Sequence, residues 1–360
     1  MSASSFRDIR FDNYKGILIT LVVIGHFLWG YRDIELYRQV CLAIYLFHMP
    51  AFVLISGYFS KPTIKAVSIC QLLVSFFIVN TLMMVFSVLV LGADIHLLSP
   101  YYSCWYLLAL VAWRLLLPAA TSVKSPLLMM VLSVLLAISV GFCDEITNEF
   151  ALSRIISFFP FFLLGYYLRN EEGLAGGFTR LMNWPGAKVL GFLVFILGLC
   201  LGIFLINRLG IVFNDELMSP YGEGLFSELA RRFAVFAFAL LCSLSLLLCM
   251  PNREIRFISR SGRNSLTVYL FHRVISLVFL LMFPTLGLSP ASALLLAIAS
   301  LATVYVLGLN PLARAYGGFV LAITTLICNP EGERRKRTAL IAGFVLLVCL
   351  FFAASGLYSS

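Results

Sequence analysis

The sequence predicts an all-α fold, a polytopic integral membrane bundle of about ten or eleven transmembrane helices. The chain of 360 residues is 61% apolar and only 12% charged, with a mean hydropathy of +0.98. Soluble globular proteins are roughly half apolar and a quarter charged. Apolar runs of about 18 residues or more also recur along the chain, which is the length that a membrane-spanning helix needs. We therefore exclude a soluble domain.

The basic residues predict how the chain crosses the cell membrane. The net charge of +9 would suggest nucleic acid as a partner of a soluble protein. Here Lys and Arg instead gather in short loops between apolar runs, as in the cytoplasmic loops of membrane proteins. We expect a multi-pass protein of the cytoplasmic membrane, surrounded by membrane lipids, with its N-terminus in the cytoplasm and no nucleic acid partner. The first apolar run follows Asp12 and lacks a small-residue cleavage site, so we do not interpret it as a removed signal peptide.

The predicted spans follow the apolar runs in chain order. Spans one to five cover about residues 16–30, 40–59, 66–91, 104–117 and 126–142. Spans six to ten cover about residues 155–168, 189–206, 233–250, 266–283 and 291–309. The basic loops KPTIK and PNREIRFISRSGRN are expected on the cytoplasmic side, and the acidic loop CDEITNEF on the external side.

The C-terminal region is expected to differ from the rest of the chain. The run GGFVLAITTLIC is too short to cross the membrane comfortably, so it predicts a re-entrant or interfacial segment. The basic string ERRKR marks the cytoplasmic side, and IAGFVLLVCLFFAASGL then predicts a last span. We therefore expect one membrane domain over residues 1–315, followed by an interfacial segment and an extra helix over 316–360.

Three of the four histidines fall inside predicted spans. His26, His48 and His272 lie in spans one, two and nine, and at 1.5 Å per residue each comes close to the membrane midplane. An ionisable group at that depth costs roughly 2.5 kcal/mol or more and marks a functional site by default. The alternative is that each histidine only forms an interhelical hydrogen bond that aids packing. Three at one depth favour function. Neither a carboxylate nor a Cys cluster accompanies them, so we expect no metal.

Lys15 and His26 are expected on one face of the first span. They are eleven residues apart, which is close to three helical turns and about 16 Å along the axis. Lys15 would then lie at the headgroup level. Asp12 and Lys15 form an i, i+3 pair at the predicted helix start. They are either a capping acid with a lysine reaching to the interface or parts of a site.

Other polar and aromatic residues have both a structural and a functional interpretation. Arg260 and Arg263 lie in a basic loop that marks the cytoplasmic side of the membrane. Arg side chains in such a loop also suit an anionic nucleotide. Gly57, after Ser56, is expected to permit close helix packing. Trp105 fits an interfacial aromatic belt.

Several strings resemble a known family. DNYKGILITLVVIGHF resembles the first span of the membrane acyltransferase-3 superfamily, whose mark is a basic residue, ten residues and a histidine. Lys15 and His26 meet this pattern, with Lys where many members have Arg. FHMPAFVLISGYFS, CWYLLALVAWRLLLP, FPFFLLGYYL and GRNSLTVYLFH resemble the fucose 4-O-acetylase-like branch, in the expected order. The resemblance covers roughly residues 7–312.

The resemblance implies a membrane O-acyltransferase. Such an enzyme moves an acetyl or other acyl group from cytoplasmic acetyl-CoA (acyl-CoA), a co-substrate, to a carbohydrate or lipid-linked glycan. It implies His26 as the catalytic base or transient acyl carrier, Lys15 as its basic partner and Asp12 as a supporting acid. His48 and His272 lie in motifs of the same branch and are further catalytic candidates.

The resemblance also guides the expected binding residues. We expect the coenzyme to contact Lys15, Arg114, Arg260 and Arg263, and the acceptor to contact Trp105, Tyr269 and Ser56. Because the resemblance covers no large external domain, we expect a partner protein on the outer face.

Two other classes of function stay open from the sequence. An exporter of polysaccharide or lipid-linked sugar would also place polar residues at the midplane, and internal repeats would favour it. We see no such repeat, and the spacing of Lys15 and His26 favours the enzyme. A purely structural membrane scaffold leaves the three buried histidines unexplained.

Overall fold

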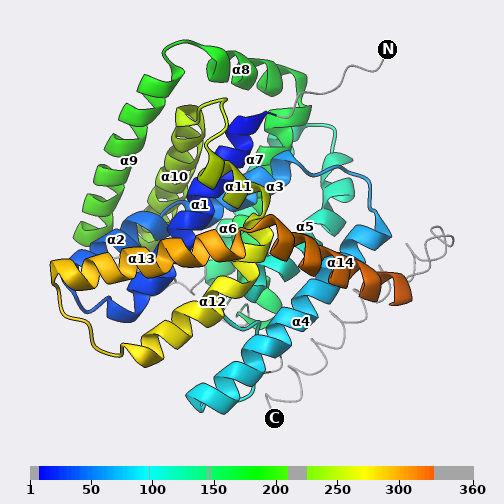
Figure 1. The fold of residues 1–360 in the computed structure, drawn as a ribbon. Helices are drawn as coiled ribbons and strands as arrows, with labels where there is room; N and C mark the ends of the chain where they lie inside the picture. Colours follow the sequence, from blue (N-terminus) through cyan, green and yellow to red (C-terminus); the bar gives the residue numbers. More distant parts are fainter. Residues whose placement is uncertain (1–7, 97, 144–145, 147, 210–224, 328–360) are drawn as a thin grey trace.

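The computed structural model describes residues 8–96, 98–143, 146, 148–209 and 225–327. This part of the chain is a bundle of α-helices without strands (Figure 1). The first seven helices are α1 (Ile9–Leu28), α2 (Glu35–Tyr45), α3 (His48–Tyr58), α4 (Ala66–Leu91), α5 (Trp105–Thr121), α6 (Pro126–Ser139) and α7 (Leu152–Asn170). The others are α8 (Glu172–Asn183), α9 (Ala187–Leu209), α10 (Leu225–Cys249), α11 (Arg256–Arg263), α12 (Ser265–Met282), α13 (Pro290–Leu307) and α14 (Asn310–Ile327).

Short 3-10 turns extend several of these helices. They are η1 (Trp29–Tyr31), η2 (Tyr102–Cys104), η3 (Val140–Phe142) and η4 (Glu149–Ala151). In the described part of the chain, nine helical segments are long and apolar enough to cross a membrane, and α6 with η3 is a shorter apolar helix. The predicted polytopic all-α fold is thus confirmed. The run GGFVLAITTLIC lies largely within α14, which begins at Asn310, before the expected boundary at 315. The predicted last span lies outside the described residues.

The first helix begins seven residues before the predicted start of its span. Asp8 is its N-cap, and the Asp8 side chain accepts a hydrogen bond from the Arg10 amide. Asp12 therefore lies within the helix, where it is buried with a carboxylate oxygen 3.4 Å from Lys15 Nζ. The interpretation of Asp12 as a capping acid is wrong, because the helix has already begun at Ile9.

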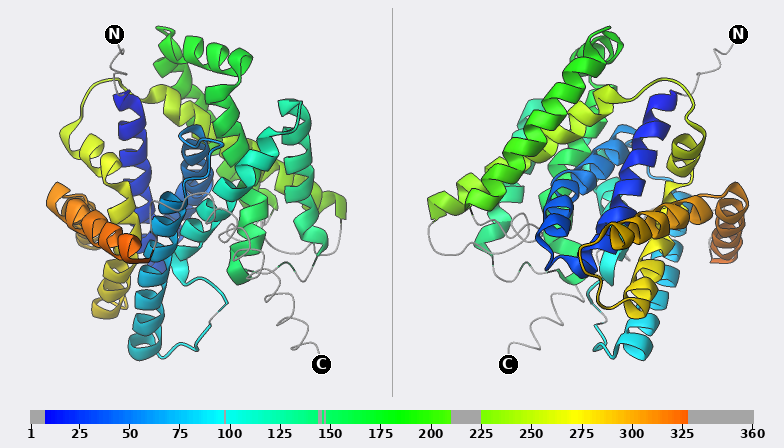
Figure 2. Two further views of the ribbon diagram at one scale, coloured as in Figure 1. Left: turned by 90° about the vertical axis from the view of Figure 1, so that its right-hand side faces the viewer. Right: turned by 60° about the vertical axis from the view of Figure 1, so that its left-hand side comes forward.

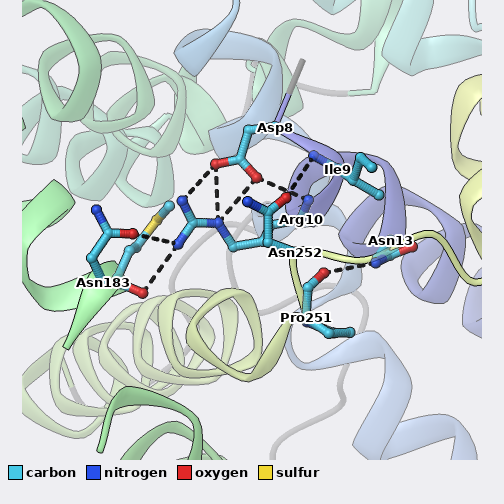
Figure 3. Close-up of polar contacts among 8 residues, drawn as sticks. Asp8, Ile9, Arg10, Asn13, Asn183, Pro251 and Asn252 are labelled. Carbon is cyan, nitrogen blue, oxygen red and sulfur yellow. Dashed lines mark hydrogen bonds and ion pairs between the residues drawn. The ribbon is translucent and has the colours of Figure 1, made fainter. Parts of the chain in front are cut away.

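Several polar groups at the start of α1 pair with residues distant in the sequence, in the loop after α10 and at the end of α8 (Figure 3). The Arg10 guanidinium pairs with Asp8 at 2.7 Å and donates to Asn183 Oδ1 at 3.0 Å. The Asn13 amide donates to the Pro251 carbonyl at 2.8 Å, and Asn252 accepts from the backbone of Ile9. Such long-range partners explain how polar residues 9–15 can extend an apolar helix.

The predicted second span is two helices. α2 ends at Tyr45 and α3 begins at His48, with the break at Leu46 and Phe47. Pro50 lies in the first turn of α3, where its missing amide hydrogen is tolerated. In a continuous helix its ring would clash with the carbonyl four residues earlier. The predicted span over about 40–59 is confirmed as the candidate membrane segment Glu35–Tyr58, in which the helix is broken.

Two helix pairs approach closely through glycines that face the partner backbone. A Cβ atom at Gly57 of α3 would overlap the Phe162 carbonyl oxygen of α7, and one at Gly165 of α7 would overlap the Leu54 carbonyl oxygen of α3. Small residues allow such approach in membrane bundles. The close packing predicted at Gly57 is confirmed.

The second glycine pair joins α1 to α11. A Cβ atom at Gly16 would overlap the Ile258 carbonyl oxygen, and one at Gly262 would overlap the Asp12 carbonyl oxygen. α1 also packs against α12 and α13, and Figure 2 shows it running beside α11. This contact fixes the basic helix α11 against the segment of α1 that carries Asp12 and Lys15. We call this end of the bundle the Lys15 end.

The glycine contact between α3 and α7 leads to a stability prediction. Gly165→Ala should lower the unfolding free energy by about 1–3 kcal/mol, because the added methyl group forces the two backbones apart. The matched control is Gly176→Ala in α8, where nothing lies within 4 Å of the added Cβ and helix propensity favours Ala. Thermal unfolding of the detergent-purified protein measures both. Equal melting temperatures for Gly165→Ala and the wild type would contradict the close contact.

Candidate active site

A cavity of about 220 Å³ lies between α1, the break between α2 and α3, η2 with the start of α5, and helices α7, α10 and α12. It lies near the end of α1 that is opposite the Lys15 end. Aromatic, histidine and arginine side chains form much of its wall. These are His26, Trp29, Tyr45, His48, Tyr102, Trp105, Arg154, Phe158, Tyr269 and Arg273. A mostly apolar pocket with a few convergent polar groups is the usual form of a small-molecule site.

His26 has two hydrogen-bonding partners at one ring nitrogen. The Tyr45 hydroxyl is 3.1 Å and Arg273 Nη1 is 3.5 Å from His26 Nδ1. A guanidinium can only donate, so Nδ1 accepts and the ring proton of neutral His26 lies on Nε2. The Nδ1 lone pair therefore points toward two hydrogen-bond donors, the Tyr45 hydroxyl and the Arg273 guanidinium.

His48 and His272 hold the opposite tautomer. His48 Nδ1 lies 3.0 Å from the Ile44 carbonyl oxygen, and His272 Nδ1 lies 2.7 Å from the Tyr269 carbonyl oxygen. A carbonyl can only accept, so both histidines carry a proton on Nδ1. Their Nε2 lone pairs are then available. That of His272 is buried without a hydrogen-bonding partner in the described chain.

The three histidines predicted at one depth come together from three helices. The ring centroids of His26 and His272 are 5.1 Å apart. Tyr45 lies between the other two, with its ring 5.8 Å from His26 and 4.8 Å from His48. His26 and His48 line the cavity, and His272 lies behind His26. The break in the second span allows this arrangement, because it places Tyr45 and His48 at the junction of two helix ends.

Two of the predicted acceptor-binding residues line the cavity. Trp105 packs against Phe158, with ring centroids 5.4 Å apart, and the Arg154 guanidinium carbon lies 5.1 Å from the Trp105 ring centroid. Tyr269 donates a hydrogen bond to the Ser103 carbonyl oxygen.

The third predicted acceptor residue, Ser56, does not line the cavity. Its hydroxyl is hydrogen bonded to the Tyr106 hydroxyl at 2.6 Å, and the Tyr106 ring lies 5.3 Å from that of Tyr269. Ser56 therefore lies one side chain behind the cavity wall.

The predicted donor-binding residues lie away from the cavity. α1 is continuous from Lys15 to His26, so the two residues lie on one helix face about 16 Å apart. Arg260 and Arg263 are on α11 at the Lys15 end. Arg114 is half-buried in α5 and does not line the cavity.

The two arginines of α11 differ in their contacts. Arg263 pairs with Glu254 at 2.8 Å. Arg260 stacks over the Tyr305 ring at 4.6 Å, and its Nε and one Nη lack a hydrogen-bonding partner in the described chain.

Sequence reasoning missed Arg273, Tyr45, Tyr102 and Arg154 as cavity residues. For Arg273 a signal was present, because a charged residue inside an apolar span is a functional-site candidate in its own right. The two tyrosines gave no comparable signal. Among the described residues, no group of three His, Cys, Asp or Glu could hold a metal ion.

A comparison with protein families matches residues 8–309 to the acyltransferase domain of the acyltransferase-3 family. The chain therefore belongs to this family, and its fold makes it a multi-pass membrane acyltransferase. The matched residues include the whole cavity. The resemblance seen in the sequence strings is confirmed at the level of the superfamily.

Two curated relatives match a shorter stretch. The nodulation protein NolL of Sinorhizobium fredii (strain NBRC 101917 / NGR234) is 47% identical over 73 residues, which is 18% of this chain and 19% of the relative. The NolL protein of Mesorhizobium japonicum (strain LMG 29417 / CECT 9101 / MAFF 303099) is 46% identical over 69 residues, 18% of each chain. The chain thus matches less than a fifth of the length of either relative. No solved structure matches.

The tautomers assigned above can be observed directly. Histidine labelled with ¹⁵N in the purified protein should show two neutral rings with the proton on Nδ1 and one with it on Nε2. With four histidines in the chain, single substitutions can assign each signal. Exposed His96, outside the candidate spans, is the internal reference. A His48 ring protonated only on Nε2 would contradict its hydrogen bond to Ile44.

Proposed function

We propose that this protein transfers an acyl group, most simply acetyl, from acyl-CoA to a hydroxyl of a cell-surface or lipid-linked carbohydrate. The observation that carries the proposal is the His26 Nδ1 lone pair, which faces a cavity shared with Tyr45 and Arg273 in a chain of the acyltransferase family. Acyl transfer needs such a basic nitrogen together with donors for the carbonyl oxygen.

In the direct mechanism, the acceptor hydroxyl attacks the thioester carbonyl carbon and forms a C–O bond. His26 Nδ1 takes the hydroxyl proton, while the electron pair of the C=O bond moves to oxygen. Collapse of this intermediate re-forms C=O and breaks the C–S bond. The coenzyme A thiolate leaves and receives the proton from His26, so the ester and the free thiol are the products.

In the acyl-carrier mechanism, His26 Nδ1 itself attacks the thioester and forms a C–N bond as the thiolate leaves. The acceptor hydroxyl then attacks the acyl-imidazole, and the C–N bond breaks. A base must remove the hydroxyl proton in this second step and pass it to the coenzyme A thiolate, which becomes the free thiol. His48 suits this role, because its Nδ1 proton is held by Ile44 and the ring lines the same cavity.

The Lys15 end is the proposed donor entrance. The positive-inside pattern predicts this end on the cytoplasmic side, where acyl-CoA is available. Lys15 and Arg260 lie there, and their positive charges suit the phosphate groups of acyl-CoA. Arg263 is a weaker candidate because it is already paired with Glu254. Arg114 is a weaker candidate because it is half-buried in α5. Asp12 holds Lys15 in place through their contact.

The opposite end is the proposed acceptor entrance. Aromatic walls such as Trp29 and Trp105 offer flat apolar faces to a sugar ring, and the nearby polar groups can orient its hydroxyls. A partner protein on the outer face would present or carry away the glycan.

Replacing His26 tests the proposal. His26→Ala should lower the rate of acyl transfer roughly 10²–10⁴-fold, the range attributed to a positioned acid–base group. The assay uses purified protein in nanodiscs with radiolabelled acetyl-CoA and membrane glycans from cells that lack this chain. His96→Ala is the matched control and should keep full activity, since His96 is exposed and outside the cavity.

A folded His26→Ala protein that acylates at the wild-type rate would overturn the role of His26. A wild-type protein that releases no coenzyme A, yet moves sugar across liposomes, would overturn the enzymatic function in favour of an exporter.

Replacing Arg260 tests the donor entrance. Arg260→Gln should raise KM for acetyl-CoA about tenfold with little change in kcat, because a hydrogen bond to a charged group contributes about 1.5 kcal/mol or more. Acetyl-pantetheine lacks the nucleotide, so its KM should be the same for both proteins. An equal loss for both donors would contradict a nucleotide contact.

A further inference from the structure

Arg273 places a positive charge inside a membrane helix, and no described carboxylate pairs with it. It lies in the middle of α12, and it forms no ion pair in the described chain. Its Nε is buried and has no hydrogen-bonding partner in the same part of the chain. The contacts it does make are with His26 Nδ1 at 3.5 Å and with the Tyr102 ring, 4.8 Å from its guanidinium carbon.

These contacts do not balance the charge. A cation over an aromatic ring gains little compared with the cost of removing a charge from water, and a ring nitrogen is a neutral acceptor. Buried charges in proteins are normally paired, and those inside membranes line functional paths. A guanidinium that lines a cavity without a counter-ion is therefore suited to a negative charge that enters or forms in that cavity.

We infer that Arg273 stabilises the oxyanion formed when the thioester carbonyl is attacked, an inference that rests on the proposed function. Its Nη1 and the Tyr45 hydroxyl both lie within 3.5 Å of His26 Nδ1, the nitrogen that accepts the proton or the acyl group. A carbonyl carbon that reacts at this nitrogen must carry its oxygen close to the same two donors. Arg273 thus touches the reacting atoms and is a catalytic residue.

The position of Arg273 argues against a permanent anion of the acceptor as its partner. Such a group would occupy the space beside His26 Nδ1 that the reacting carbonyl needs. Arg154 is the other cavity arginine, and it lies over Trp105 rather than beside His26. The oxyanion is the negative charge that appears where Arg273 is placed.

Substitution of Arg273 should affect the chemical step more than binding. Loss of one oxyanion donor lowers kcat roughly 10²–10³-fold. We expect this loss for Arg273→Gln. The KM for acetyl-CoA should change less than about threefold, because the lost interaction forms only in the transition state and not with the bound substrate. Arg273→Lys keeps the charge but not the fork, so its loss should be smaller. The nanodisc assay with radiolabelled acetyl-CoA and membrane glycans measures all three proteins.

Chemical rescue separates catalysis from structure. In Arg273→Gly, added guanidinium chloride should restore part of the activity, whereas sodium chloride at the same concentration should not. The same addition should leave His26→Ala inactive. The matched control is Arg32→Gln, because Arg32 also lies 4.8 Å from an aromatic ring, that of Trp29, but is exposed and outside the cavity. It should keep wild-type kinetics.

Each outcome decides the inference. A loss in kcat with guanidinium rescue supports it. A wild-type kcat for Arg273→Gln, or a loss that guanidinium cannot restore in a folded Arg273→Gly protein, overturns it while leaving the acyltransferase function in place. A rise in KM for the glycan alone also overturns it, in favour of an anionic acceptor. Absence of acyl transfer by the wild type overturns the proposed function and this inference together.

Discussion

Within a membrane, every backbone carbonyl and amide must find its partner inside the protein, and this constraint also holds where the second span breaks. The chain turns at Leu46 and Phe47, where the Leu46 amide donates to the Leu42 carbonyl at 3.1 Å and the Phe47 amide to the Ile44 carbonyl at 3.4 Å. His48 Nδ1 donates a second hydrogen bond to the same carbonyl oxygen, at 3.0 Å. The same bond fixes the tautomer of His48 and positions Tyr45 between His48 and His26. The break in the second span thus places both Tyr45 and His48 at the candidate site.

Close helix contacts hold this geometry from two sides. The reciprocal glycines of α3 and α7 keep the segment after His48 against the helix that carries Phe158, a wall of the cavity. Those of α1 and α11 hold the other end of the first helix. The histidines come from α1, α3 and α12, so their separation depends on how these helices pack rather than on any one loop.

Much of the fold could be predicted, because composition and run length depend only on local sequence. The common depth of the three histidines could likewise be predicted by counting residues along each span. Their contacts with one another could not be predicted in this way. The break at Leu46 was missed because the run 40–59 is apolar throughout, and Pro50 alone does not reveal which turn opens. The start of α1 was missed because Asn13 finds its partner at Pro251, far along the chain. The charge of Arg273 inside an apolar span was visible in the sequence, but its distance from His26 was not, because only tertiary packing sets it.

The first helix has a further consequence for the kind of donor that the protein can accept. Lys15 and His26 are joined by uninterrupted helix, so their spacing is eleven rises of about 1.5 Å and cannot be adjusted by a loop. If the two residues contact opposite ends of one donor molecule, the fixed length of helix between them sets the distance that the donor must span. A donor whose anionic end and reactive carbonyl are too close together would touch one residue and miss the other. Selectivity for the length of the carrier arm would then be set by the count of residues between them, independently of the cavity that chooses the acyl group and the acceptor.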